Sequence, residues 1–278
     1  MTEPTDGQLF DVPEPRTPVE LLLSLSGNYT RHNDALALFR PTHASGPELG
    51  AHANSAAQLA HESLAAVKAV QDQQLYASAD LIDATVRIKQ IAYLSSEAAR
   101  HLAEAQAVVT AASLANPERT GPPDGVDRQV RLAQELTALA PEAAVESATG
   151  IARETQRRRP AAAGASDGLA AAELSALHAA ARGHVVMTQS LGRQYVHSRD
   201  DRVRISTLRS LESKGLITRE PATAPPAYDN GPAQDRIRLT ACGATTVAAL
   251  LAAPPTTPAS ATPAVPPAPA TTAPTRSR

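Results

Sequence analysis

A long stretch without helix-breaking residues most constrains the fold of this chain. Between Gly50 and Ala115 the sequence contains neither proline nor a further glycine, and alanine is frequent throughout. Alanine has the highest helix propensity, whereas glycine and proline interrupt helices. We therefore expect one long helix over residues 47 to about 115, with at most one break.

The larger apolar residues of this stretch recur at a spacing of seven. Leu81, Ile88, Leu102 and Val109 follow that spacing, and small alanines lie between them. A repeat of seven is typical of helices that pack along their length. Polar residues interrupt the repeat, so an ideal two-stranded coiled coil is disfavoured. Because small residues permit close approach, an alanine-rich antiparallel pairing fits the pattern better.

A second helical stretch completes a hairpin. A loop rich in proline and glycine covers residues 116–125, and the helical pattern then runs over residues 127–158. Pro141 lies inside it and should kink or split the helix, because proline has no amide hydrogen to donate. The two stretches predict a long, coiled-coil-like helical hairpin over residues 47–158. It can pack within one chain or between two chains.

The segments that flank the hairpin and end the chain carry weaker signals. Residues 1–46 are expected to be mostly disordered, with short helical pieces at 19–25 and 33–39 separated by Ser26, Gly27 and Asn28. Neither piece has enough apolar area to stand alone, so each is expected to be disordered or docked on the helices that follow. Residues 159–168 are expected to form a flexible linker. Residues 254–278 hold eight prolines among alanines and threonines, so they cannot bury a core and are expected to be disordered.

A small mixed module is predicted over residues 169–253. A helix is expected over 170–182, short strands over 184–188 and 194–197, and a final helix over 243–251. Between them, Ile205, Leu208 and Leu211 lie three apart, as on one face of a helix. Ser206 or Thr207 can cap the start of that helix. Gly215 can take the positive φ of its end, and two strands of a hairpin follow.

The residue pattern of this module resembles the C-terminal half of MarR-like bacterial regulators. The matching residues are Ser206-Thr207-Leu208, Leu211, Lys214-Gly215-Leu216-Ile217, Arg238-Leu239-Thr240 and Gly243. The resemblance covers about 85 residues and implies a winged helix-turn-helix. One departure is that a strand-like and turn-like segment, 184–202, replaces the usual helix before the recognition helix. The expected fold class is therefore mainly α with a small α+β module, a long N-terminal helical hairpin followed by a winged helix.

The resemblance also implies a set of DNA contacts. In winged helices the recognition helix enters the major groove and the wing lies on phosphate or in the minor groove. Carried over to this chain, Arg209 would read guanine, and Arg202, Arg204 and Lys214 would contact phosphate. The tip of the wing has no Lys or Arg. The complete predicted set is Arg202, Arg204, Ser206, Thr207, Arg209, Ser210, Ser213, Lys214, Arg219, Arg236 and Arg238.

The distribution of charge agrees with an anionic partner for the C-terminal part only. Residues 1–168 contain 14 Lys and Arg against 21 Asp and Glu, whereas residues 169–253 contain 10 against 7. A basic module that follows an acidic one indicates that any nucleic acid would bind the module. The excess is modest, and many ordinary domains reach it.

Motifs for catalysis, cofactors or metals are absent from the sequence. It has no phosphate loop, dinucleotide fingerprint or nucleophile elbow, so we expect no enzyme and no cofactor. His197, Asp200 and Asp201 form the one compact cluster of ligand types, and a polar turn is the expected role rather than a metal site. The single cysteine, Cys242, excludes an internal disulfide and a cysteine-based zinc cluster, and a packed thiol is expected.

Cellular location follows from two features of the sequence. No run approaches the roughly 20 apolar residues of a membrane helix, and the first 15 residues are acidic and proline-rich, unlike a signal peptide. We therefore expect a cytoplasmic protein without a membrane partner.

Sequence-specific DNA binding is the function that these patterns favour. The chain would be a transcriptional regulator, dimerised through its N-terminal helices, which set the spacing of two recognition helices. The alternative is a non-enzymatic scaffold, in which the winged helix binds protein or mediates dimerisation and the long helices form a stalk. A third hypothesis is a regulator that binds a small ligand between the hairpin and the winged helix, and this hypothesis rests on the fold analogy alone.

Overall fold

The computed structural model describes residues 16–40, 45–73, 78–116, 121, 123–158, 168–190, 192–199, 202–228 and 231–253. The expectations of disorder for residues 1–15 and for 254–278 lie outside these ranges. So do residues 159–167 of the expected linker, and Asp200 and Asp201.

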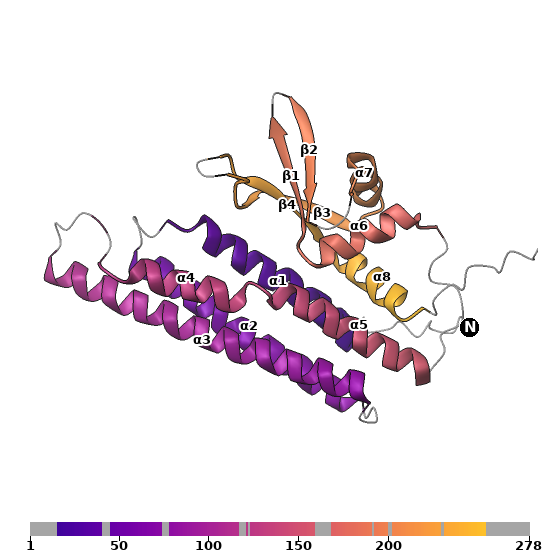
Figure 1. Ribbon diagram of the computed structural model, residues 1–278, viewed down its shortest axis with the longest axis horizontal. Coiled ribbons are helices and arrows are strands. Elements are labelled where there is room, and N and C mark those ends of the chain that lie inside the picture. Colours follow the sequence, from indigo (N-terminus) through magenta and orange to yellow (C-terminus); the bar gives the residue numbers. More distant parts are fainter. Residues whose placement is uncertain are drawn as a thin grey trace, which may run out of the picture.

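Five helices form an elongated bundle in the N-terminal part (Figure 1). They are α1 (Pro18–Leu38), α2 (Gly46–Asp72), α3 (Ala79–Ala115), α4 (Val126–Thr137) and α5 (Ala140–Arg158). The stretch expected to form one long helix breaks once, before Ser78, whose hydroxyl caps α3 by accepting the Leu81 N–H. Helices α2 and α3 pack on each other within the chain, and α4 and α5 lie along α3.

The second arm of the expected hairpin is split. Helix α4 ends at Thr137, and α5 starts at Ala140, with Pro141 as its second residue. Proline is well tolerated in the first turn of a helix, where its missing N–H would have no intrahelical partner. The position of Pro141 therefore agrees with the split expected from the sequence.

Helix α1 corrects the expectation of two short pieces. It runs unbroken through Ser26-Gly27-Asn28 and starts with a capping box between Thr17 and Glu20. Leu22, Tyr29 and Leu36 lie seven apart and are fully buried. The Tyr29 hydroxyl lies 2.9 Å from Ser63 Oγ and 2.7 Å from Ser95 Oγ, on α2 and α3. Contacts with distant helices, rather than local propensity, stabilise this helix.

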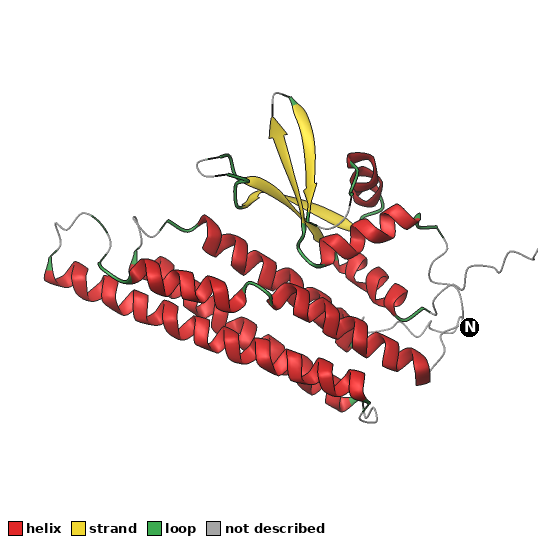
Figure 2. Ribbon diagram, in the orientation of Figure 1, coloured by secondary structure: helices red, strands yellow, loops and turns green. Residues whose placement is uncertain are grey.

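The C-terminal part is a small α+β module (Figure 2). Its elements are α6 (Ala171–Ala181), β1 (Val185–Ser190), β2 (Arg193–Ser198), α7 (Ile205–Ser213), β3 (Ile217–Ala224), β4 (Gln234–Leu239) and α8 (Ala241–Leu251). The strands form one antiparallel sheet in the order β2-β1-β4-β3. The protein is thus mainly helical with a small four-stranded sheet. Strand β2 stands where the resemblance implies a helix, and the winged-helix interpretation stays a prediction.

The two faces of the sheet have different neighbours. Met187, Ile217 and Ile237 on one face share a hydrophobic cluster with Leu208 and Leu211 of α7. Residues of β4 that alternate with Ile237 contact α1 instead. The same cluster continues into the bundle through α1, α3 and α5. The bundle and the module therefore share one continuous core.

Three local predictions can be compared with the structure: the cap of α7, the glycine at its end and the environment of Cys242. The N-cap of α7 is Arg204, without a side-chain cap, so neither Ser206 nor Thr207 has the predicted capping role. Gly215 has a φ of 68°, as predicted for the end of that helix. Cys242 is exposed, which corrects the expected packed thiol, because it lies in the first turn of α8 on its outer side.

Within the described ranges, no helix combines the length and the hydropathy that crossing a membrane requires.

Candidate nucleic-acid interface

The start of α7 holds three exposed residues of the predicted set of DNA contacts. Arg202, Arg204 and Ser206 are exposed. The N-cap residue gives α7 no side-chain hydrogen bond. The first N–H groups of a helix point outward without intrahelical partners, and the helix dipole adds partial positive charge there. Together with two arginines, this end of α7 is a surface on which a phosphate group can bind.

Arg209 lies one turn further along the same helix. It is exposed, and its Nη2 donates a hydrogen bond to Oε1 of Gln194 on β2 at 3.1 Å. This hydrogen bond holds the guanidinium beside the β1–β2 hairpin. Thr207 is half-buried, and Glu212, exposed on the next turn, places one carboxylate on the same helix. Arg209 is therefore accessible, but a DNA base would have to replace Gln194 as its partner.

Lys214 and Ser210 form hydrogen bonds within the protein. Lys214 Nζ lies 2.8 and 2.9 Å from the two carboxylate oxygens of Glu173 on α6, and Ser210 Oγ donates to Glu173 Oε1 at 2.7 Å. Hydrogen bonds from Lys214, Ser210 and the Ala170 N–H lower the pKa of Glu173 to about 2. Ser213 Oγ donates to the Ser210 carbonyl at 2.8 Å. These side chains attach α7 to α6 or stay within α7.

Arg219 is also paired. Its Nε donates to Asp235 Oδ2 at 2.6 Å across the β3–β4 hairpin. The other carboxylate oxygen of Asp235 accepts the Ala222 N–H at 2.8 Å. Ala222 has a φ of 54°, which is unusual for a residue with a side chain. Asp235 thus holds both the arginine and the irregular backbone of this hairpin.

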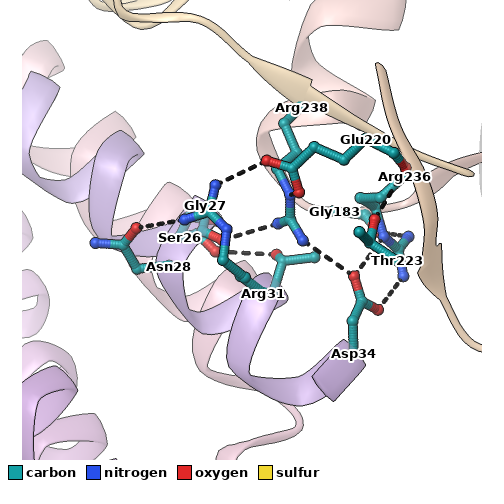
Figure 3. Close-up of polar contacts among 11 residues, drawn as sticks. Ser26, Gly27, Asn28, Arg31, Asp34, Gly183, Glu220, Thr223, Arg236 and Arg238 are labelled. Carbon is teal, nitrogen blue, oxygen red and sulfur yellow. Dashed lines mark hydrogen bonds and ion pairs between the residues drawn. The ribbon is translucent and has the colours of Figure 1, made fainter. Parts of the chain in front are cut away.

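Arg236 and Arg238 are buried, which corrects their assignment as DNA contacts (Figure 3). Only 8% and 5% of their surfaces are exposed. Arg236 donates to both oxygens of Asp34 on α1, at 2.8 and 2.5 Å, and to the Gly183 carbonyl at 2.6 Å. Arg238 donates to Glu220 at 2.5 Å and to the Gly27 carbonyl at 2.9 Å. Both side chains project from the sheet face that contacts α1.

Glu220 of this junction stays charged because of the arginines around it. Burial raises the pKa of Glu220, but hydrogen bonds from Arg31 and Arg238 outweigh burial, and the pKa lies below its usual value. Arg31 Nη2 donates to Glu220 Oε1 at 2.8 Å (Figure 3). Burial lowers the pKa of Arg238, while Glu220 and Asp34 oppose that shift. The network connects α1 to the β3–β4 hairpin through charges that are mutually compensated.

The sequence analysis missed the acidic partners Asp34, Glu173, Glu220 and Asp235. Nothing in their local sequence marks them. The alternation Arg236-Ile237-Arg238 was the usable signal: if Ile237 faces the core, both arginines share the opposite face of the strand. What that face contacts depends on α1, about 200 residues earlier.

Neither a cluster of metal ligands among the described residues nor a relative adds to this description. Among the described residues, no three His, Cys, Asp or Glu side chains form a group that could hold a metal ion. His197 is exposed on β2. Comparison with protein-family models, curated proteins and solved structures gives no match to this chain. The functional argument therefore depends on the geometry of α7 and its surroundings.

Proposed function

We propose that the protein binds DNA through α7 and acts as a cytoplasmic bacterial transcriptional regulator, without catalytic activity. The observation that carries the proposal is the uncapped start of α7, flanked by the exposed Arg202 and Arg204. The order of elements around it supports the interpretation of α7 as a recognition helix and of β3–β4 as a wing. This interpretation depends on the resemblance of the module to MarR-like regulators.

The proposed contact set is smaller than the one predicted from the sequence. Arg202 and Arg204 would bind phosphate together with the first N–H groups of α7. Ser206 and Thr207 would lie at the groove, and Arg209 would read a base. Arg209 also has a partner, Gln194, which a base would have to replace. Six other predicted contacts have partners within the protein and are left out of the proposed set: Ser210, Ser213, Lys214, Arg219, Arg236 and Arg238.

The test is selection of DNA fragments from random-sequence and genomic pools, followed by fluorescence anisotropy at two salt concentrations. Each phosphate contact should contribute a slope of about 0.9 log units per decade of salt. Arg204→Ala should weaken binding to all sequences and lower that slope by about 1, and Arg209→Ala should relax sequence preference.

The matched control is Arg131→Ala, which removes an exposed arginine of α4 from the bundle. It should leave affinity and salt slope unchanged. Absence of binding at low salt, or equal losses in Arg131→Ala and Arg204→Ala, would reject α7 as the DNA-binding element.

Exposed apolar residues on α3 favour a second candidate, an interaction role for the bundle. Ile82, Val86 and Tyr93 are 54%, 57% and 65% exposed. Their spacings of four and seven place them on one helix face. A second copy of the chain seated there would form a homodimer through the N-terminal helices, and could also serve a DNA-binding dimer. Light scattering should then give twice the chain mass, and Val86→Glu should give the monomer.

A further inference from the structure

Strand β2 presents cationic and aromatic side chains on one exposed face. Arg193, Tyr195 and His197 alternate along the strand, and Arg199 follows its last residue. All four are exposed, whereas the residues between them are half-buried. Alternate residues of a strand point to the same face, so these four side chains form one surface, which we call the β2 surface. An extended chain spans about 20 Å from its first arginine to its last, which suits a polymer better than a single ion.

The β2 surface and α7 lie on opposite faces of the sheet. Gln194, which alternates with the residues of the β2 surface, accepts the hydrogen bond from Arg209 of α7. Strand β4 pairs with β1 at Val186 and Met187, near the start of that strand. The outer part of the β1–β2 hairpin therefore projects from the module, away from the bundle (Figure 1). Its exposed face is open to a partner.

The charge of the β2 surface favours an anionic partner. The sequence has no aspartate or glutamate between Glu173 and Asp200. Within the described ranges, neither Arg193 nor Arg199 forms an ion pair with a carboxylate. Uncompensated arginines on an exposed face attract anions.

Carboxylates approach the β2 surface at its inner end. Arg199 lines a cavity next to the bundle together with Asp34 and Glu142. Asp34 is compensated by two buried arginines, so Glu142 is the carboxylate of this cavity that can offset Arg199. Residues 200–201, both acidic, lie outside the described residues. The outer end of the β2 surface, with Arg193 and Tyr195, therefore carries most of the argument.

Tyr195 distinguishes the β2 surface from a merely cationic one. Its side chain is 46% exposed, between the exposed Arg193 and His197 on the same face. Aromatic rings beside cations are the groups that bind single-stranded nucleic acids, because the rings stack on bases and the cations pair with phosphates. A histidine ring can stack on a base as well. In a duplex the bases already stack on one another, so an exposed ring favours a single strand.

We propose that the β2 surface binds single-stranded nucleic acid. Arg193 and Arg199 would pair with phosphates, and Tyr195 and His197 would stack on bases. Single-stranded DNA and RNA share the phosphates and the base faces that this chemistry recognises. The inference uses the residues of the β2 surface alone, so it does not depend on the binding of duplex DNA by α7.

Fluorescence anisotropy of the full chain with labelled oligo-dT and oligo-U tests the proposal. We expect saturable binding, with a salt slope of about 0.7 log units per decade for each phosphate contact. The tighter oligonucleotide identifies the preferred sugar. Inorganic polyphosphate has the charge but no bases, so at equal charge it should compete about tenfold more weakly. Absence of binding at low salt, or equal competition by polyphosphate, would overturn the proposal.

Variants of exposed side chains locate the site without disturbing the core. Tyr195→Ala should weaken binding about five- to a hundredfold, because it removes a stacked ring, whereas Tyr195→Phe keeps the ring and should keep most of the affinity. Arg193→Gln should lower the salt slope by about 0.7. The matched control is Tyr228→Ala, which removes a 68% exposed tyrosine from the loop after β3, where the sequence has no Lys or Arg. Equal losses in Tyr195→Ala and Tyr228→Ala, or in Tyr195→Ala and Tyr195→Phe, would reject stacking on this surface.

A crossed comparison separates this proposal from the one for α7. Arg204→Ala should weaken binding of duplex DNA and leave affinity for the oligonucleotides unchanged, and Tyr195→Ala should do the reverse. Binding of single strands without binding of a duplex would reject α7 and support the β2 surface. A loss of oligonucleotide affinity in Arg204→Ala as large as in Tyr195→Ala would assign single strands to α7 and overturn the inference.

Discussion

Two Arg-x-Arg segments of the module have opposite environments. Arg202 and Arg204 lie in the chain before α7, and both are exposed. Arg236 and Arg238 lie within β4, and both are buried against α1 with Asp34 and Glu220 as partners. A strand places alternate residues on one face, so both arginines of β4 meet the same neighbour. The comparison shows that a basic pair in a sequence can serve as an internal anchor as readily as a binding surface.

The largest effect should come from removing the shared acidic partner. Asp34→Ala leaves Arg236 without its carboxylate and Arg238 with Glu220 alone. Leaving a buried charge unpaired costs about 3–5 kcal/mol. Urea denaturation followed by circular dichroism should show a fall of that size in the free energy of unfolding. Arg31→Ala, which removes an exposed partner of Glu220, should cost less than about 1 kcal/mol. Similar losses in both variants would contradict the anchoring role of Asp34.

Lowering the pH should destabilise the protein through the buried His32 of α1, independently of the Asp34–Arg236 pair. His32 is buried two residues before Asp34, and burial lowers its pKa to about 4, with a smaller contribution from His52. Between pH 6.5 and 4 the unfolded chain binds a proton that the folded chain excludes. Stability should therefore be complete above pH 6.5 and fall by about 3 kcal/mol by pH 4.

Denaturation at a series of pH values measures this loss. His32→Asn keeps a polar atom for Ser55 Oγ, which lies 3.0 Å from Nδ1 of the histidine, but it cannot titrate. The variant should lose most of the slope between pH 6.5 and 4. A slope that stays as in the wild type would assign the acid sensitivity to other groups, among them His52 of α2, whose pKa is also lowered by burial.

The pair between Lys214 and Glu173 should have an intermediate effect. The Lys214 side chain is 38% exposed, so solvent screens its attraction to Glu173. Lys214→Ala should lower the free energy of unfolding by about 1 kcal/mol or less. Raising the salt concentration should shrink the difference from wild type. A loss of stability as large as that of Asp34→Ala would show that Lys214 contributes as much as the buried arginines do, which contradicts the screening by solvent.

The exposed segment should matter least to stability. Replacing Arg202 and Arg204 together by alanine should change the free energy of unfolding by no more than about 0.5 kcal/mol, because neither side chain is buried. The same double variant should lose affinity for DNA if the proposed function is right. A stability loss above 2 kcal/mol would show that the two Arg-x-Arg segments do not differ as described.

Local patterns predicted the parts of the fold that depend on neighbours in the sequence. Gly215 marked the end of α7, Pro141 marked the split between α4 and α5, and the strands of the module lie close to their expected places. Helix α1 was missed as a continuous helix because Tyr29 is satisfied by Ser63 and Ser95. The roles of Arg236 and Arg238 were missed because their partner Asp34 lies far away in the sequence. Contacts between residues so far apart in the chain produce no periodic pattern in the sequence.

The Asp34–Arg236 contact has a consequence for how the protein folds during its synthesis on the ribosome. It joins residues 202 positions apart, so α1 is synthesised long before β4. At typical rates of elongation, roughly 10–40 s separate the two. During that interval the carboxylate of Asp34 stays hydrated, and the sheet-facing side of α1 remains uncovered. The junction between bundle and sheet is therefore among the last parts of the nascent chain to be completed.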